Sequence, residues 1–238
     1  MKTSIILPTY KEKDNILELI QAVFTVLEPT NIQFEIVVVD DNSPDGTADV
    51  IRAYHSHDQR VKLFVRTEER GLATALRYGV DQSDGDILVF MDTDFNHDPA
   101  IIPQMVKFLE YYDIIIGSRF VMAGGMEDKF RQFSSSLYNQ AIQLLFNTPV
   151  HDNLSGFFAI YRDKLTAMDL DQIYYGYGDY FIRLLMIANR RGYKMLEVPV
   201  FYRLRLHGHS KTQFLSIFSQ YSRALFMLRL KLWTGRMR

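Results

Sequence analysis

Short apolar runs alternate with amphipathic helical patterns along the first half of this chain. The predicted strands are Ser4–Leu7, Phe34–Val39, Val61–Val65, Ile87–Met91 and Asp113–Gly117. Apolar residues at i, i+3 and i+4 spacing predict helices over Asp14–Leu27, from Thr47, over Gly71–Val80 and over Ala100–Tyr112. This order predicts an α/β fold with a Rossmann-like, mostly parallel sheet flanked by helices on both faces.

The pattern changes after about residue 120. Val121–Lys129 is a predicted loop, and the later elements are helices over Phe133–Phe146 and Tyr180–Arg191 and strands over Phe157–Tyr161 and Lys194–Val200. A long helical pattern with interspersed basic residues covers Thr212–Trp233. We predict one domain over residues 1–211, with halves 1–119 and 120–211, followed by a basic amphipathic helix over 212–238.

Composition excludes several classes of protein. The chain has 238 residues, 47% of them hydrophobic, which is enough for a sizeable core. Its net charge of -1 provides no field that would attract nucleic acid, and the absence of cysteine excludes disulfides and thiolate metal sites. The first apolar run is too short for a signal peptide, and no run reaches the roughly 18–20 residues of a membrane span. We therefore expect a cytoplasmic protein.

Two carboxylates, Asp92 and Asp94, follow the apolar run Ile87–Phe90. Oxygen ligands suit hard divalent cations such as Mg2+ or Mn2+, which often bridge protein carboxylates to the phosphates of a substrate. Ligands of open α/β sheets bind beyond the carboxyl ends of the strands, where this pair is expected. Alone, the pair also fits a solvated turn with an Asx cap.

Three further polar clusters follow predicted strands: Leu7–Glu12, Val39–Thr47 and Gly117–Arg119. Each has an ordinary structural explanation, because Pro8 and Tyr10 can shape a loop and Thr47 can cap a helix. Asp40 and Asp41 are harder to explain, since burying a carboxylate without a partner is costly. A nucleobase or a ribose hydroxyl would be a natural partner.

Together these segments resemble the GT-A fold glycosyltransferases of family 2, and among them the dolichyl-phosphate mannose synthases and related polyprenyl-phosphate glycosyltransferases. The matching segments are Leu7-Pro8-Thr9-Tyr10 with Glu12, Val39–Thr47, Gly71-Leu72, Met91–Asp94, Gly117–Phe120, Asp152, Ser155–Phe158, Gly192–Lys194, Glu197–Pro199 and Gly208-x-Ser210-Lys211. The order of these segments and the specific string Asp-Asp-Asn-Ser-Pro-Asp-Gly-Thr are not expected by chance. The resemblance runs from Leu7 to Lys211.

The resemblance implies roles for individual residues. The nucleotide sugar, with guanosine as its usual nucleoside, would contact Pro8, Tyr10, Glu12, Val39, Asp40, Asp41, Asp92, Thr93, Asp94, Arg205 and Lys211. Asp92 and Asp94 would bind the metal, and Asn96 is the further candidate ligand, because it stands where relatives carry a Gln ligand on a longer arm. The chain also departs from the family at Lys11, where Asn is common, and at His209, where Glu is usual.

The implied reaction is metal-dependent, inverting transfer of mannose from GDP-mannose to a polyprenyl phosphate. Mg2+ or Mn2+ on Asp92 and Asp94, together with Arg205 and Lys211, would stabilise the departing diphosphate. A phosphate acceptor needs no general base, because its second pKa is about 6. It needs cations instead, and Arg119 and Arg131, with Ser135, are the candidates. Asp94, Arg119, Arg131, Arg205 and Lys211 are thus the predicted catalytic residues.

Two other functions stay open. The first is a family 2 enzyme that uses a UDP-sugar and a hydroxyl acceptor, with Asp179 as general base rather than as the cap of a helix beginning at Tyr180. The second is a non-catalytic module that binds sugar nucleotides. The pairs His55/His57 and His207/His209 lack the further ligands of a zinc site. His209 is a candidate hydrogen-bond donor to a phosphate, and His97 is expected to face solvent.

The segment 212–238 interleaves large apolar residues with arginine and lysine. Such a helix can pack on the core, or lie at a membrane with its basic edge toward anionic lipid. Because a polyprenyl phosphate is a membrane lipid, we expect peripheral contact with the cytoplasmic face of the membrane.

Overall fold

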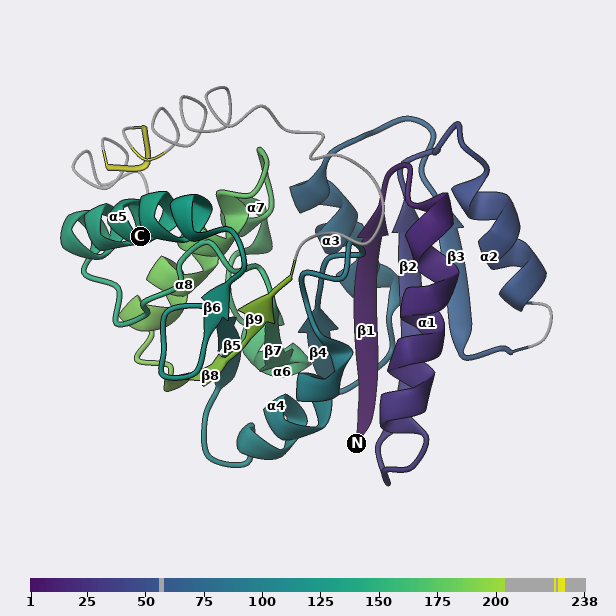
Figure 1. Cartoon of the computed structure of the whole chain (residues 1–238), viewed down its shortest axis with the longest axis horizontal. Coiled ribbons are helices and arrows are strands. Elements are labelled where there is room, and N and C mark those ends of the chain that lie inside the picture. Colours follow the sequence, from purple (N-terminus) through teal and green to yellow (C-terminus); the bar gives the residue numbers. More distant parts are fainter. Residues whose placement is uncertain (56–57, 204–224, 226, 230–238) are drawn as a thin grey trace.

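The computed structural model describes residues 1–55, 58–203, 225 and 227–229 (Figure 1). The strands are β1 (Lys2–Thr9), β2 (Gln33–Asp40), β3 (Val61–Val65), β4 (Ile87–Phe90), β5 (Ile114–Ser118), β6 (Gly125–Met126), β7 (Phe158–Tyr161), β8 (Met195–Pro199) and β9 (Phe201–Tyr202). The helices are α1 (Lys13–Leu27), α2 (Thr47–His55), α3 (Leu72–Gln82), the 3-10 helix η1 (Pro99–Ile101), α4 (Ile102–Phe108), α5 (Lys129–Phe146), α6 (Arg162–Thr166), α7 (Leu170–Ile173) and α8 (Tyr180–Arg190).

Seven strands form the central sheet in the order β3-β2-β1-β4-β7-β5-β8. All neighbours in this sheet pair in parallel except β7, which runs antiparallel to both β4 and β5. The expected mostly parallel sheet is therefore confirmed. A separate parallel pair, β6 with β9, lies beside it. The polar loops that follow β1, β2 and β4 leave the sheet at the same edge, because these three strands share one direction.

Helices cover both faces of the sheet, and neighbouring residues of a strand point to opposite sides. Ile5 and Leu7 of β1 pack with α1 and α4, whereas Ile6 between them packs with α3, α5 and α8. Figure 1 shows α1 lying across β1 and β2 on the near side. On the far side α3 approaches closely at Gly79, where an added Cβ would lie 2.6 Å from Ile6 Cγ2.

The prediction of β3 matches the structure residue for residue, and several other boundaries differ for local reasons. The predicted helix over Ala100–Tyr112 is shorter, since α4 begins after a 3-10 turn and ends at Phe108. α5 begins at Lys129 rather than Phe133, because the carboxylate of Asp128 caps it by accepting from the amide of Arg131 at 2.9 Å.

The predicted loop over Val121–Lys129 contains β6, which pairs with β9. Tertiary pairing creates this two-residue strand, and local composition does not encode it. The short helices α6 and α7 were not predicted either.

At the amino ends of the strands, opposite the polar loops, a cluster of charges surrounds Glu35. This side chain is 1% exposed and accepts from Ser4 Oγ at 2.7 Å and from the amide of Asp84 at 2.9 Å. Lys2 and Lys62 each place Nζ 2.7 Å from Glu35 Oε2 and also reach Asp84. The hydrogen bond from Lys2 is the main reason why the pKa of Asp84 falls to about 2. We call Lys2, Glu35, Lys62 and Asp84 the amino-end ion cluster.

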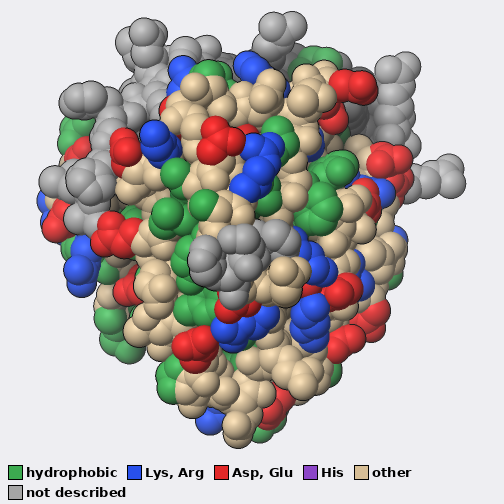
Figure 2. All heavy atoms as spheres, turned by 90° about the vertical axis from the view of Figure 1, so that its right-hand side faces the viewer, with side chains coloured by type: hydrophobic (Ala, Val, Ile, Leu, Met, Phe, Trp, Pro, Cys, Tyr) green, Lys and Arg blue, Asp and Glu red, His purple; other side chains and the backbone are tan. Residues whose placement is uncertain are grey.

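Among the described residues, no helix is both long and apolar enough to cross a membrane. Figure 2 views the side of the molecule at which α2 and β3 lie, and acidic and basic side chains are interspersed over that face. No strip of a single charge dominates the face in this view.

Candidate active site

A cavity of about 450 Å³ opens at the carboxyl ends of β1, β2 and β4. Its lining residues are Pro8, Thr9, Tyr10, Glu12, Asp41, Arg70, Gly71, Leu72, Ala75, Asp92, Thr93, Asp94 and Tyr177. Most come from loops directly after strands, which is where open α/β sheets bind ligands. The structure thus brings together residues that the sequence places far apart.

The loop after β1 contributes Pro8, Tyr10 and Glu12 to the cavity. Tyr10 is 37% exposed, and the cationic groups of Lys11 and Arg70 lie 5.5 and 5.4 Å from the centre of its ring. The carboxylate of Glu12 accepts from Asn15 Nδ2 at 2.8 Å, and its amide donates to Thr47 Oγ1 at 3.1 Å. These contacts join the loop to the start of α2 and hold the tyrosine ring at the cavity.

The carboxylates of Asp40 and Asp41 have partners within the protein. Asp40 accepts from Thr9 Oγ1 at 2.9 Å and from the amide and hydroxyl of Ser43 at 2.8 and 2.6 Å. Asp41 accepts from Arg66 Nε at 2.7 Å and from the amide of Gly71 at 2.8 Å. Both side chains therefore organise the loops around the cavity. Only Asp41 lines it, while Asp40 and Val39 are fully buried in the sheet.

The loop after β4 carries Asp92, Thr93 and Asp94, all of which line the cavity. The side chain of Asp92 is 49% exposed. Asn96 donates through Nδ2 to Asp94 Oδ2 at 2.8 Å, and its amide donates to Asp94 Oδ1 at 3.2 Å. In this arrangement Asn96 orients the carboxylate of Asp94.

This donor set fits a hard divalent cation. Both carboxylates reach one cavity, and the described part of the chain contains no group of three or more His, Cys, Asp or Glu side chains that could enclose an ion. Mg2+ characteristically binds through one or two carboxylates and completes its shell with water and substrate phosphates. Asp92 and Asp94 would hold such an ion.

His97 is fully buried, which corrects the expectation that it faces solvent. Its Nδ1 accepts from the amide of Asp92 at 2.8 Å, and its Nε2 lies 2.6 Å from the hydroxyl of Tyr202. The imidazole also stacks on Phe157, with ring centres 4.8 Å apart and planes at 12°. Sequence reasoning missed this because both aromatic partners are distant in the chain.

The loops after β1, β2 and β4 each contain a non-glycine residue in the left-handed region. Lys11 has φ 59°, Asn42 has φ 52° and Phe95 has φ 60°. Asparagine tolerates this conformation, but a lysine or a phenylalanine adopts it at a cost. The departure from the family at Lys11 therefore places a less suitable residue at a strained position.

The predicted acceptor residues lie on the other half of the molecule. Arg119 is 5% exposed and binds both oxygens of Asp152, with Nε to Oδ2 at 2.7 Å and Nη2 to Oδ1 at 2.6 Å. Arg131 and Ser135 lie on α5, where Arg131 is exposed and Ser135 half-buried. None of these three lines the cavity described above. Arg205, Lys211 and His209 lie outside the described residues, as do His57, His207 and nearly all of 212–238.

Asp179 immediately precedes α8 but makes no capping hydrogen bond with its side chain. Its carboxylate forms an ion pair with Arg183, which is 2% exposed, and accepts from the amide of Tyr177 at 2.9 Å. The side chain therefore neutralises a buried arginine, a role that differs from both the cap and the general base considered from the sequence.

Arg66, Arg70 and Tyr177 belong to the site and were not predicted. Arg66 is buried and holds Asp41, whereas Arg70 and Tyr177 line the cavity. A signal for the two arginines was present, because they follow β3 at the same sheet edge as the other clusters. Tyr177 carries no such signal, since it reaches the cavity from the loop between α7 and α8.

Solved structures of other proteins share the fold of this chain. Glucosyl-3-phosphoglycerate synthase from Mycobacterium tuberculosis, solved with Mn2+, UDP and glucosyl-3-phosphoglycerate, superposes with a TM-score of 0.71 and 21% identity over 96% of this chain and 79% of that one. A structure of the same synthase with Mg2+ and UDP has a TM-score of 0.69 and 20% identity, covering 96% of this chain and 79% of that one. These structures show that the chain has a GT-A fold.

Curated relatives are closer in sequence. The chain is 35% identical to the dolichol-phosphate mannosyltransferase of Pyrococcus furiosus, over 99% of this chain and 65% of that protein, so it spans less than two thirds of that relative. It is 32% identical to the undecaprenyl-phosphate mannosyltransferase of Micrococcus luteus, over 89% of this chain and 87% of that protein. The family model named glycosyl transferase family 2 matches residues 4–168, and the chain therefore belongs to glycosyl transferase family 2.

Proposed function

We propose that this chain catalyses metal-dependent, inverting transfer of mannose from GDP-mannose to a polyprenyl phosphate. The observation that carries the proposal is the placement of Asp92 and Asp94 in one cavity with Tyr10, Glu12 and Arg70. The names of the relatives support a polyprenyl phosphate as acceptor and mannose as the sugar. Residues 1–119 would form the nucleotide-sugar half, and residues 120–211 the acceptor half.

The donor would lie along the cavity with its base near Tyr10 and its diphosphate near Asp92 and Asp94. Tyr10 offers an exposed aromatic face, and Arg70 beside it offers a planar cation that suits a phosphate or a base. Mg2+ or Mn2+ held by the two carboxylates would neutralise the charge that develops on the leaving diphosphate. Arg205 and Lys211 are the proposed further cations. Asp41 fixes Arg66 and Gly71 and so shapes the cavity wall.

A phosphate acceptor fits the environment of Asp179 better than a hydroxyl acceptor does. A hydroxyl nucleophile needs a general base, whereas a phosphate monoester is already mostly dianionic at neutral pH. Asp179 is the base considered from the sequence, and its carboxylate is engaged by Arg183 and by the amide of Tyr177. We therefore assign Asp179 a structural role, and the proposed reaction includes no deprotonation of the acceptor. Attack by the phosphate from the face opposite the diphosphate would invert the anomeric carbon.

Helix α5 supports a lipid acceptor. Its inner face buries Asn139, Ile142 and Phe146, and its outer face exposes Phe130, Phe133, Leu137 and Leu144 by 75, 64, 53 and 87%. Arg131 and Ser135, the proposed acceptor-phosphate residues together with Arg119, lie on the same helix. Exposed apolar stripes on amphipathic helices are typical of membrane-surface contact. We propose peripheral contact of the protein with the cytoplasmic face of the membrane.

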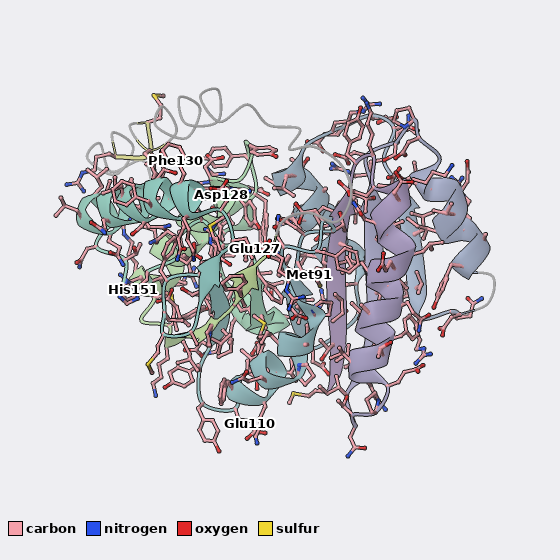
Figure 3. The ribbon with its side chains drawn as sticks, in the orientation of Figure 1. Met91, Glu110, Glu127, Asp128, Phe130 and His151 are labelled. Atoms are coloured by element: carbon pink, nitrogen blue, oxygen red, sulfur yellow. The ribbon has the colours of Figure 1, made fainter. Side chains whose placement is uncertain are left out.

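The stripe can be tested with vesicles. The double variant Phe133→Ser/Leu137→Ser should lower sedimentation with phosphatidylglycerol-containing vesicles several-fold, because each exposed side chain would lose apolar burial in the bilayer. Tyr111→Ser is the matched control, since Tyr111 is 69% exposed and adjoins Glu110 at the bottom of Figure 3, whereas Phe130 lies at the top. Equal sedimentation of all three proteins would refute membrane contact through α5.

The proposed reaction is tested by incubating the chain with Mn2+, radiolabelled GDP-mannose and detergent-dispersed undecaprenyl or dolichyl phosphate. Label should enter the organic phase as a mannosyl phosphate lipid, and chelation should prevent its formation. Parallel reactions contain UDP-glucose as donor, or a free lipid alcohol as acceptor. Transfer only with UDP-glucose would refute GDP-mannose as the donor. Transfer only to the alcohol would refute a polyprenyl phosphate as the acceptor. Binding without transfer in every reaction would favour the non-catalytic module.

A further inference from the structure

We propose that His97 and Tyr202 form a positioning pair that holds the Asp92–Asp94 loop in register for the cation. Neither residue lines the cavity. His97 acts on the loop through the amide of Asp92, and its Nε2 also lies 3.9 Å from Asp92 Oδ2. The inference rests on the proposed function, because it assumes that Asp92 and Asp94 hold a divalent cation.

The pair begins where the pairing of β4 with β1 ends. Phe90 is the last residue of β4 to pair with β1, and the amide of Met91 lies 3.4 Å from the carbonyl of Ile6. The next amide, that of Asp92, donates to Nδ1 of His97 at 2.8 Å. Phe95, with φ 60°, reverses the chain between the two residues and allows the imidazole to reach back. His97 therefore supplies the hydrogen bond that the sheet no longer provides.

The hydrogen bonds define which nitrogen of His97 carries the proton. Because Nδ1 accepts from a backbone amide, Nε2 carries the hydrogen of the neutral ring and donates to Tyr202 Oη, 2.6 Å away. The hydroxyl of Tyr202 in turn donates to the carbonyl of Ser155 at 3.3 Å. Burial raises the pKa of Tyr202, which keeps its hydroxyl protonated. A continuous chain of hydrogen bonds thus leads from the metal loop to the loop before β7.

Aromatic packing fixes the same two side chains from the sides. Phe157 stacks on the imidazole, and the guanidinium of Arg119 lies 4.8 Å from the centre of the Tyr202 ring. Tyr202 also belongs to β9, which pairs with β6 within the proposed acceptor half. The chain continues from β9 toward Arg205, three positions further on. The pair therefore ties the metal loop to the strand that precedes the proposed diphosphate-binding cations.

The structure offers variants that separate positioning from folding. Tyr202→Phe removes only the hydroxyl and keeps the ring between Arg119 and His97. His97→Asn keeps an acceptor close to the position of Nδ1 but cannot reach Tyr202. Tyr174→Phe is the matched control, because Tyr174 is also a buried tyrosine and its hydroxyl has no hydrogen-bond partner among the described residues.

The test is the affinity for Mn2+ in the presence of saturating GDP, measured from the free Mn2+ signal in electron paramagnetic resonance, with thermal unfolding recorded for each variant. We expect Tyr202→Phe and His97→Asn each to raise the apparent Kd for Mn2+ about tenfold, the size of effect that outer-shell partners typically have. The double variant should bind Mn2+ no more weakly than the single variant with the higher Kd, since both substitutions break the same contact between His97 and Tyr202. Tyr174→Phe should leave the Kd unchanged.

Three results would overturn the inference. One is an unchanged Kd in Tyr202→Phe with a lower unfolding temperature, which would make the pair merely structural. Another is a hundredfold loss in the double variant, which would mean that the residues act independently. The third, a wild-type chain that binds no Mn2+ with GDP, would also overturn the proposed function, whereas the first two leave that function intact.

Discussion

The two edges of the central sheet treat their carboxylates in opposite ways. At the amino ends of the strands, Glu35 is buried and neutralised by Lys2 and Lys62. At the carboxyl ends, Asp92 and Asp94 both line the cavity. The first edge relieves its charge within the fold. The second presents two carboxylates to one cavity, an arrangement that suits a divalent cation.

Backbone conformation follows the same division. Three of the five described non-glycine residues with positive φ, namely Lys11, Asn42 and Phe95, lie in loops at the carboxyl edge, and the other two are Ala123 and Asn147. Strained conformations persist at functional sites when the surrounding contacts hold them in place. Here Ser43 Oγ accepts from the amide of Lys11 at 2.9 Å, and His97 holds the loop that contains Phe95. The comparison suggests that stability has been given up at the edge where the cavity lies.

The largest expected effect comes from Asp94→Asn. Loss of one charged ligand should lower mannosyl transfer on the order of 10²–10³-fold, because stabilisation of the leaving diphosphate depends on it. The unfolding temperature should change little, because asparagine keeps a side-chain oxygen that can accept from the amide of Asn96. Steady-state kinetics and calorimetry measure the two quantities. Asp98→Asn is the control, as Asp98 is exposed in the same loop but outside the cavity.

Glu35→Gln should have the opposite signature. Lys2 and Lys62 would lose their shared carboxylate, at a cost of about 1–3 kcal/mol in the free energy of unfolding. The cost is moderate because these lysine side chains are 33 and 32% exposed and can regain water. Urea denaturation measures it. Transfer activity well below the unfolding temperature should be preserved, and a loss of activity comparable with that of Asp94→Asn would break the comparison between the edges.

Lys11→Asn should stabilise the protein by about 1 kcal/mol, because asparagine adopts φ 59° more easily than lysine does. Urea denaturation again gives the free energy. Lys13→Asn serves as the control, since Lys13 begins α1 and is not among the residues with positive φ. A lower free energy of unfolding in Lys11→Asn would contradict the claim that the backbone conformation of Lys11 is strained.

The smallest effect concerns pH. The pKa of Asp84 is lowered to about 2 in the folded protein, so the carboxylate contributes stability above its unfolded value of about 4. That contribution is lost as the pH falls from about 4 through about 2. Asp84 is 60% exposed, and solvent screening limits the effect to below about 1 kcal/mol. Asp84→Asn should flatten the pH dependence of the unfolding free energy in this window, and an unchanged slope would contradict the assignment.

Much of the structure of residues 1–119 could be predicted from short stretches of sequence. The spacing of Ile16, Leu19, Ile20 and Val23 identifies α1, and all four side chains are buried. The approach of Asp92 and Asp94 to the residues after β1 follows from parallel strands that end at one edge. Such patterns are local, or depend only on strand direction, and a single sequence contains them.

The remaining features depend on partners that are distant in sequence. His97 contacts Phe157 and Tyr202, and Arg119 contacts Asp152. No spacing rule connects these residues. The sequence analysis therefore placed His97 at the surface and did not predict the ion pair between Arg119 and Asp152. The strand β6 and the contribution of Tyr177 to the cavity were missed for the same reason.

The most direct test of the central claim is calorimetric titration of GDP-mannose into the chain, with and without Mn2+. The loops after β1, β2 and β4 should bind GDP-mannose only when Mn2+ is present, and more tightly than UDP-glucose under the same conditions. Asp94→Asn should abolish the dependence on Mn2+. Binding of GDP-mannose that is unaffected by excess chelator, or that persists undiminished with Mn2+ in Asp94→Asn, would contradict the account.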